Sequence, residues 1–456
     1  TALEYGKQII IIDAGVAFPT ADLLGVDLVI PDFTYLKENA DKIAGLFLTH
    51  GHEDHIGAVP YVLKELNIPI YGTKFTLSLL DNKLKEHKLN NVKMHTVKEG
   101  SVIKTGDFSV EFIHVNHSIA GACALAIKTP IGMVYHTGDY KIDYTPVDGK
   151  IADLRRIAEI GDKGVLLMLG ESTNVEHQGH SLSERRVGFV LDRYISENPE
   201  KRVIIATFST NIHRIKQILD VAKRYNRKVA FSGRSMVNIV EVAKKTKEID
   251  IPDDLIVDID KIKKIADKNL LIISTGSQGE PMSALTRMAS DDYVKVTIGD
   301  NDLVILSSSP IPGNEKMVYE VINNLYKKGA KVIYDALFEV HASGHSCQDE
   351  MKLILSLIKP KYFIPVHGEY RHLKQHSLLA QEMGISEYNI LIPKIGTFAE
   401  LTSDSMVMKN GIVAGSLLVD GSGLGEKDSI VLRDRKHLSE DGIIIILISL
   451  GENGTL

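Results

Sequence analysis

The sequence predicts an α/β protein in which a layered first domain is interrupted by an inserted domain with a parallel sheet. Two observations support this prediction. Several strand-length apolar runs end in polar residues, which is typical of layered α/β folds that bind ligands at the carboxyl ends of strands. Between residues 183 and 340, strand-like and helix-like segments alternate in βαβα order. That order indicates a parallel sheet with helices on both faces.

The composition is that of an ordinary globular protein. The chain has 456 residues, of which 44% are hydrophobic and 25% charged, enough for two or three domains. No apolar run is long enough to span a bilayer, and we expect no signal peptide. Cys123 and Cys347 are the only cysteines, so we expect a cytoplasmic protein without disulfides. The net charge of −6 argues against a general polyanion binder but allows a local basic groove.

Short apolar runs outline the first domain. Strands are expected at residues 7–12, 26–30, 44–48, 68–71, 108–115, 122–128, 133–135 and 164–169. Helical periodicity and charge placement predict helices at residues 56–66 and 74–87. Polar residues follow several of these strands, so the predicted strand ends are the first place to look for a site.

The insertion is expected to begin with a helix that runs to about residue 196. It follows Ser181-Leu182-Ser183-Glu184, which matches a capping box. Further strands are expected at residues 203–206, 228–231, 270–274 and 303–306, and further helices at 212–224, 236–244, 281–288 and 315–328.

After the insertion, the first domain is expected to resume. Residues 341–345 open a helix to about residue 357, followed by a strand at 362–365 and a helix at 371–383. Beyond residue 402, short strands with Gly-rich turns are expected, and the apolar run 442–450 is expected to start a further element. The expected domains are 1–182 and 341–425 for the first domain, 183–340 for the insertion, and 426–456 for a linker and the start of a truncated C-terminal domain.

The run Leu48-Thr49-His50-Gly51-His52-Glu53-Asp54-His55-Ile56-Gly57 predicts a metal site. Three histidines and an aspartate lie within six residues, directly after a buried strand. Imidazole and carboxylate are the usual ligands of zinc and similar divalent ions. Clustering unpaired polar groups there is costly unless a metal satisfies them. His50 and His52 can hold one ion, and Asp54 and His55 can face a second.

Later residues complete this predicted centre. His117 follows a strand and joins His50 and His52 on the first ion. Asp139, also at a strand end, is suited to bridge both ions because a carboxylate has two oxygens. His367 is the best candidate for the remaining ligand of the second ion. Alone, His117 could equally be an ordinary loop histidine. Asp13 could be a turn residue or could support a ligand histidine.

These motifs carry a family resemblance. The H-x-H-x-D-H run resembles the metallo-β-lactamase superfamily, whose fold is an αββα sandwich. Glu171 after a strand, with His345 and His367 beyond an insertion, resembles the β-CASP group of nucleases within it. The chain is also similar to the bacterial ribonuclease J family along nearly its whole length, in segments such as Asp27-Leu28-Val29-Ile30-Pro31-Asp32, Asn116-His117-Ser118-Ile119, Thr207-Phe208-Ser209-Thr210-Asn211, Ser308-Ser309-Pro310-Ile311-Pro312-Gly313-Asn314-Glu315 and Pro365-Val366-His367-Gly368-Glu369.

The sequence also departs from the family pattern. Ala120-Gly121 stands where the family often has Pro-Asp, and Glu171 stands where Asp is common. The first departure removes an acid, so no role is expected for a carboxylate at that position. The second is conservative, because it keeps the carboxylate.

The resemblance implies an activity. We expect a metal-dependent ribonuclease that acts as a 5′-to-3′ exonuclease on 5′-monophosphorylated single-stranded RNA and also as an endonuclease, in mRNA decay and rRNA maturation. It implies two divalent ions per chain, Zn²⁺ or alternatively Mn²⁺, and a structural Ca²⁺ near Asp420. It further implies a homodimer or higher oligomer, or an assembly with a paralogous subunit, and no membrane association.

The resemblance also assigns roles to residues. Asp54, His345 and Glu171 are expected in catalysis: His345 would contact the scissile phosphate and protonate the leaving group, and Glu171 would accept a hydrogen bond from His345. The phosphate pocket is expected to comprise Ser209, Thr210, Asn211, His341, Ala342, Ser343, Gly344 and His345, with Arg234 and Ser235 as weaker candidates.

Two other functions stay open at this point. One is another hydrolase of the metallo-β-lactamase fold that cleaves a thioester or lactone. The insertion and the pair His345 and His367 argue against it. The other is an inactive RNA-binding partner subunit. Such subunits lose metal ligands, whereas every ligand position is filled here.

Overall fold

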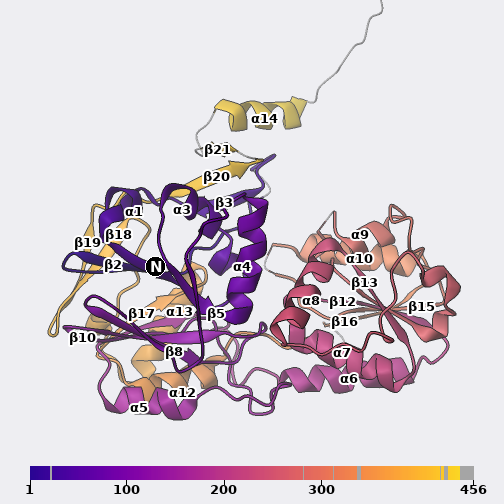
Figure 1. Ribbon diagram of the computed structural model, residues 1–456, viewed down its shortest axis with the longest axis horizontal. Coiled ribbons are helices and arrows are strands. Elements are labelled where there is room, and N and C mark those ends of the chain that lie inside the picture. Colours follow the sequence, from indigo (N-terminus) through magenta and orange to yellow (C-terminus); the bar gives the residue numbers. More distant parts are fainter. Residues whose placement is uncertain are drawn as a thin grey trace, which may run out of the picture.

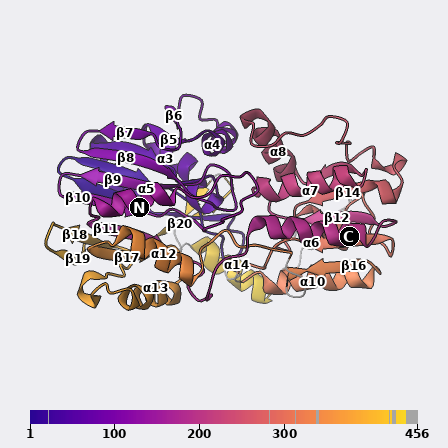
Figure 2. The ribbon, with the colours of Figure 1, turned by 90° about the horizontal axis from the view of Figure 1, so that it is seen from below.

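The computed structural model describes residues 1–20, 23–280, 282–311, 313–335, 340–421, 423–425 and 430–441. Figures 1 and 2 show two bodies side by side. The larger body is built from both ends of the described chain, and the smaller one from its middle. The predicted linker residues 426–429 and the apolar run 442–450 lie outside the described residues.

The amino-terminal strands form a five-stranded sheet in the larger body, in the order β1-β2-β4-β5-β6. These strands are β1 Ala2–Tyr5, β2 Gln8–Ile12, β4 Ile43–Phe47, β5 Ile70–Thr73 and β6 Met94–Val97. From β2 onward the strands are parallel, so β2 and β4 end at the same edge. The helices of this half are α1 Thr34–Glu38, α2 Glu53–Ile56, α3 Val59–Glu65 and α4 Lys74–Glu86.

The second sheet of the larger body has six strands in the order β17-β11-β10-β9-β8-β7. Its strands are β7 Val102–Thr105, β8 Phe108–His114, β9 Cys123–Thr129, β10 Gly132–His136, β11 Leu167–Glu171 and β17 Tyr362–Val366. The helices of this half are α5 Leu154–Asp162, α12 Gln348–Ile358 and α13 Tyr370–Glu382. Ile10 and Phe47 of the first sheet share one buried cluster with Phe112 and Leu125 of the second. The predicted αββα sandwich is therefore confirmed.

The smaller body is an insertion in the chain between β11 and β17. Its five-stranded sheet has the order β13-β14-β12-β15-β16, and every neighbouring pair is parallel, as predicted. The strands are β12 Arg202–Ala206, β13 Lys228–Ser232, β14 Leu270–Ser274, β15 Asp302–Leu306 and β16 Lys331–Tyr334. The helices are α6 Glu184–Ser196, α7 Ile212–Arg224, α8 Arg234–Thr246, α9 Ala284–Ala289 and α10 Glu315–Lys327. When the chain returns, β17 pairs in parallel with β11.

The last described segment returns to the larger body. It comprises β18 Thr397–Leu401, β19 Met406–Asn410, β20 Ser416–Asp420, β21 Gly423–Gly425 and α14 Ile430–Asp441. β20 pairs antiparallel with β3, Leu28–Pro31, so two segments far apart in sequence lie side by side. Within the described residues, no helix combines the length and apolar character needed to cross a membrane.

Several element boundaries differ from the predictions. Ser183 rather than Ser181 caps α6, because its side chain accepts from the Arg185 backbone N–H. α12 begins only at Gln348. The backbone N–H groups of Ser346 and Cys347 are bound by the carboxylates of Glu171 and Glu350, so this stretch stays outside the helix.

Candidate metal centre

The loop between β4 and α2 carries the first metal-ligand candidates. β4 ends at Phe47 and α2 begins at Glu53. Asp13 follows β2, the neighbouring parallel strand, and has a left-handed φ of 53°. Its carboxylate accepts hydrogen bonds from the backbone N–H and the hydroxyl of Thr49, at 2.8 and 2.7 Å. Asp13 therefore ties together the two strand ends that bear the site.

The first donor group consists of His50, His52 and His117. Nε2 of His50 and Nε2 of His117 lie 3.0 and 3.1 Å from Nδ1 of His52. Nδ1 of His117 lies 2.7 Å from the carbonyl oxygen of Gly344, which can only accept. The proton of His117 is therefore on Nδ1, and its Nε2 presents a lone pair to the other two rings.

The second donor group consists of Asp54, His55, Asp139 and His367. Nε2 of His55 lies 3.2 Å from Oδ2 of Asp139, and Nε2 of His367 lies 3.3 Å from Oδ2 of Asp54. Both histidines use their other ring nitrogen on a supporting residue. Nδ1 of His55 lies 2.7 Å from Asp13 Oδ2, and Nδ1 of His367 lies 2.7 Å from the hydroxyl of Thr173. Such partners fix the ring so that Nε2 faces the site.

Asp139 lies between the two groups. Its Oδ2 is 3.9 Å from Nε2 of both His50 and His117, which belong to the first group. The same oxygen is 3.6 Å from Nε2 of His367 in the second group. One carboxylate oxygen thus faces both sets of nitrogen donors, the position a bridging ligand would take.

The chemistry of these donors fits divalent ions. Burial lowers the pKa of His50 and His117 well below its ordinary value and lowers the pKa of His52 to about 4. These three rings are therefore neutral at pH 7, the form that binds a metal. Among the described residues, the buried Nε2 of His55 has no hydrogen bond of good geometry, although Oδ2 of Asp139 lies 3.2 Å away. Leaving such groups unsatisfied is costly, and a cation here would satisfy them.

The second group is charged differently. Burial favours neutral rings, but Asp139 raises the pKa of His55 well above its ordinary value and that of His367 to about 9. Burial also disfavours the Asp139 carboxylate, but His367 and His55 hold its pKa well below the ordinary value. Protons on these rings neutralise the carboxylates in the metal-free protein. A divalent ion would displace them, because ligands must be deprotonated to bind.

His345 and Glu171 lie beside this centre. His345 Nδ1 is 3.6 Å from Glu171 Oε2, an ion-pair distance rather than the predicted hydrogen bond. Glu171 instead accepts from the Thr173 N–H at 2.9 Å and from the Ser346 hydroxyl at 3.1 Å. Burial favours neutral His345, but Glu171 raises the pKa of that ring above its ordinary value. His345 can therefore carry a proton near neutral pH.

The segment from His341 to His345 connects the insertion to this centre. The Asn174 side-chain N–H groups donate to the Ser343 hydroxyl at 2.8 Å and to the His345 carbonyl at 3.1 Å. A Cβ on Gly344 would stand 2.6 Å from Ser118 Oγ and 2.9 Å from the His117 ring. Only glycine therefore lets the Gly344 carbonyl come close enough to accept from His117.

The other predicted substrate residues are more scattered. Ser209 and Thr210 precede α7, whose N-cap is the buried Asn211. Arg234 and Ser235 begin α8 and are exposed. No described hydrogen bond or ion pair joins those two to the His341–His345 segment. Asp420, the predicted Ca²⁺ ligand, has its Oδ2 2.5 Å from an Arg435 nitrogen, so an arginine neutralises it here.

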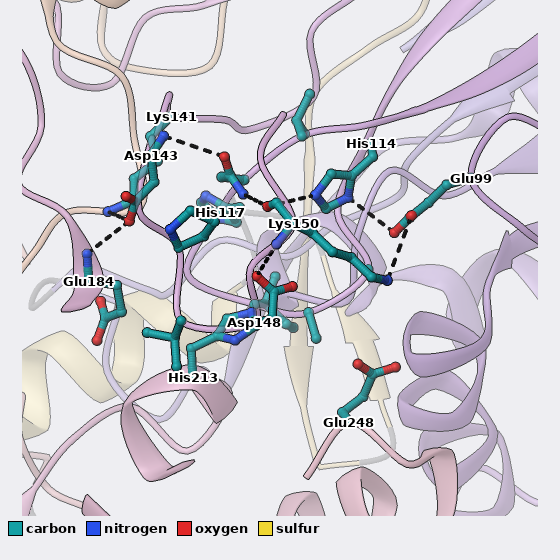
Figure 3. A pocket seen from close by; sticks show the side chains of 17 residues that line it. Glu99, His114, His117, Lys141, Asp143, Asp148, Lys150, Glu184, His213 and Glu248 are labelled. Atoms are coloured by element: carbon teal, nitrogen blue, oxygen red, sulfur yellow. Dashed lines mark hydrogen bonds and ion pairs between the residues drawn. The ribbon is translucent and has the colours of Figure 1, made fainter. Parts of the chain in front are cut away.

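His117 also lines a small polar cavity with a volume of about 60 Å³ (Figure 3). Lys141, Asp143 and His114 line it from the larger body. Glu184 and His213 line it from the insertion. The Glu184 backbone N–H donates to Asp143 at 2.9 Å, so the two bodies are hydrogen-bonded at this seam.

The sequence prediction missed several supporting residues: Thr49, Thr173, Asn174 and Arg214. Thr173 and Asn174 stand in the polar run Glu171-Ser172-Thr173-Asn174 at a strand end, a signal that could have identified them. Arg214 had only a weak signal, a charged residue on the apolar face of its helix.

Comparisons with known proteins agree with this arrangement. Residues 9–160 match the family description "Beta-lactamase superfamily domain". Residues 200–325 match "Ribonuclease J, beta-CASP domain", and residues 330–393 match "Zn-dependent metallo-hydrolase RNA specificity domain". The first match lies in the larger body and the second in the smaller one, while the third begins at β16 of the smaller body and continues into the larger one.

Curated proteins are similar over nearly the whole chain. Ribonuclease J of Synechocystis sp. is 44% identical over 99% of this chain and 71% of its own length. Ribonuclease J of Helicobacter pylori is 43% identical over 99% of this chain and 66% of its own length. A crystal structure of a protein of unknown function from Enterococcus faecalis has the same fold, with a TM-score of 0.60 and 18% identity over 86% of this chain and 94% of that one.

Proposed function

The chain belongs to the ribonuclease J family, and from this premise we propose that it is a metal-dependent ribonuclease that hydrolyses RNA phosphodiester bonds. One observation carries the proposal: two donor groups face the single oxygen of Asp139, with His345 beside them. A thioester or lactone hydrolase would need no histidine delivered from beyond an insertion of this size.

We propose two divalent ions, Zn²⁺ or Mn²⁺. His50, His52 and His117 would hold one, Asp54, His55 and His367 the other, with Asp139 shared. When bound, such ions polarise a phosphate and lower the pKa of a water molecule to roughly 7. The protein's part is to aim the donors, which it does through Asp13, Thr173 and the Gly344 carbonyl.

His345 is the proposed general acid. Its Nδ1 faces the carboxylates of Glu171 and Asp139, at 3.6 and 3.9 Å, which leaves Nε2 for the substrate. As the bond between phosphorus and the leaving oxygen breaks, that oxygen would take a proton from the His345 ring. Glu171 favours the protonated ring beforehand and so keeps the proton available.

We further propose that the RNA end lies at the seam between the two bodies. Hydroxyls and backbone N–H groups of residues 209–211 and 341–345 would bind a 5′-monophosphate and reject a triphosphate by size and charge. This supports 5′-to-3′ exonuclease action with some endonuclease action, in mRNA decay and rRNA maturation. A cytoplasmic homodimer and a Ca²⁺ at Asp420 stay predictions from the family.

The test uses single-stranded RNA labelled at its 3′ end, with either a 5′-monophosphate or a 5′-triphosphate. We expect the metal-loaded chain to release mononucleotides from the monophosphate form at least tenfold faster. Equal rates on the monophosphate and the triphosphate RNA would contradict the proposed 5′-monophosphate pocket. Internal fragments alone would show that the endonuclease activity dominates.

A further inference from the structure

The geometry points to Arg214 as a positioning residue that holds His341 as a neutral N–H donor for an RNA phosphate. This inference rests on the proposed function, which supplies the RNA. Arg214 lies on α7 of the insertion, while His341 lies where the chain returns to the larger body. The juxtaposition therefore spans the seam between the two bodies.

Arg214 is fully buried, with 0% of its surface exposed. Its Nε and Nη2 donate to the two carboxylate oxygens of Glu184, each at 2.8 Å. Nη2 also donates to the Ala342 carbonyl at 3.4 Å. Nη1 donates to the Ser307 carbonyl and lies 3.2 Å from Nδ1 of His341. A guanidinium has five N–H groups, and here each of them has an acceptor.

This arrangement fixes the proton on His341. A guanidinium can only donate, so Nδ1 of His341 must accept and cannot carry a hydrogen. The proton of the neutral ring is then on Nε2. A doubly protonated ring would turn an N–H group toward the cationic Arg214. In agreement with this geometry, burial and then Arg214 lower the pKa of His341 well below its ordinary value.

The Nε2–H group of His341 is available to a ligand. The residue is half-buried, and no described residue accepts from its Nε2. The nearby Ser343 hydroxyl accepts a hydrogen bond from Asn174, and the Gly344 carbonyl accepts one from His117. His341 is therefore only three residues along the chain from a backbone group that contacts the metal centre. A neutral donor at this position suits a phosphate oxygen, which accepts several hydrogen bonds at once.

Glu184 completes this hydrogen-bonded arrangement around Arg214. It neutralises Arg214 with two hydrogen bonds and lines the cavity shown in Figure 3. Gln217 donates to its carbonyl at 2.9 Å, and its own N–H donates to Asp143 of the larger body. The guanidinium plane thus cannot rotate away from His341 without breaking contacts in both bodies.

Arg214→Lys is the informative variant. A lysine can keep the ion pair with Glu184, but its single nitrogen cannot also reach His341, Ala342 and Ser307. We expect KM for 5′-monophosphorylated RNA to rise about tenfold or more, because the hydrogen bond from His341 to the charged phosphate is weakened. We expect kcat to change less than threefold, because that hydrogen bond contributes equally to the bound substrate and to the transition state. Bound metal should stay unchanged.

Arg202→Lys is the matched control. Arg202 makes the same kind of paired contact, to Asp302, and also donates to a backbone carbonyl, but it starts β12 at the opposite end of the sheet. Arg202→Lys should lower the thermal stability about as much as Arg214→Lys does, but it should not raise KM. A similar rise in KM for both variants would show that Arg214 has only a structural role.

A double-mutant cycle tests whether Arg214 acts through His341. A glutamine can place an amide N–H near the former Nε2, so His341→Gln should keep KM within about threefold of wild type, whereas His341→Ala should not. In the His341→Gln background, Arg214→Lys should have little further effect on KM. Equal effects of Arg214→Lys in both backgrounds would overturn the proposal.

A measurement without RNA separates this inference from the proposed function. Nitrogen-15 spectra of the histidine rings, with His341 assigned from His341→Gln, should show an unprotonated Nδ1 and a protonated Nε2 in the wild type. A proton on Nδ1 would overturn the proposal. If the spectra agree but the chain cleaves no RNA, the proposed function fails and Arg214 keeps only its effect on the ring.

Discussion

Nδ1 of His55 lies 2.7 Å from Oδ2 of Asp13, although the two residues are 42 positions apart. The same carboxylate binds Thr49 through two hydrogen bonds. One half-buried acid therefore aligns the end of β2 with the first metal-ligand loop, and it aims Nε2 of His55 at Asp139.

Asp13→Asn tests this alignment. Asparagine tolerates the left-handed backbone at this position, so the fold should survive. The amide removes the charge and one acceptor, and we expect metal affinity to fall about 10- to 100-fold, as for other lost supporting groups. Competition with a metal chelator measures it. Unchanged affinity would contradict a supporting role for Asp13.

Thr173→Val tests the corresponding contact to His367. The Thr173 hydroxyl lies 2.7 Å from His367 Nδ1, and valine keeps the shape but removes the partner. We expect affinity for the second ion alone to fall about tenfold or more. Thr173→Ser keeps the hydroxyl and is the control. Loss of the ion in Thr173→Ser but not in Thr173→Val would show that the methyl group rather than the hydrogen bond matters.

Gly344→Ala tests the close approach behind His117. The added Cβ would meet Ser118 Oγ at 2.6 Å and the His117 ring at 2.9 Å. Overpacking of this kind costs about 1–3 kcal/mol and should tilt His117 away from its group. Thermal unfolding and metal content report the effect. Gly415→Ala, whose added Cβ would meet no atom within 4 Å beyond its chain neighbours, should change neither of them.

The pair His114 and Glu99 gives a pH dependence outside the metal centre. Their atoms lie 3.0 Å apart. Burial opposes the charge on His114, but Glu99 raises the pKa of this ring above 6.5. The stabilisation of the folded state by protonated His114 is therefore complete below pH 6.5, and it is lost as the pH rises through the pKa that the ring has in the folded protein. The hydrogen bond from His114 lowers the pKa of Glu99 below 4.5, so its contribution is complete above pH 4.5 and is lost as pH falls.

His114→Gln should therefore remove stability mainly between pH 4.5 and 6.5. For a partly exposed pair the pH-dependent part should be about 1 kcal/mol or less. Urea unfolding at several pH values measures the difference in free energy of unfolding between wild type and variant. A difference that grows above pH 8 would contradict the assignment.

Four residues of the two donor groups could be predicted because their signal is local. His50, His52, Asp54 and His55 are adjacent in sequence, and residue type alone narrows the chemistry. The long strands and helices were predictable for a similar reason, since their apolar period is visible within each segment. The α7 helix has the predicted bounds, residues 212–224.

The parts that could not be predicted depend on distant partners. β6 and β7 are short and mostly not buried, so they lack a clear apolar pattern. Thr173 and His367 meet across 194 positions, and Arg214 and His341 across 127. No local pattern specifies such contacts, because they arise only when β17 pairs with β11 and the insertion closes onto the larger body.

The central claim is metal-dependent cleavage of RNA, and one titration tests it most directly. The full chain would be stripped with a chelator and given Zn²⁺ or Mn²⁺ in steps, while bound ions and cleavage of 5′-monophosphorylated RNA are measured together. We predict that cleavage is absent without metal, returns as two ions bind, and stays absent in His52→Ala, which should retain fewer ions. A wild-type chain that binds two ions yet leaves the RNA intact would contradict the account.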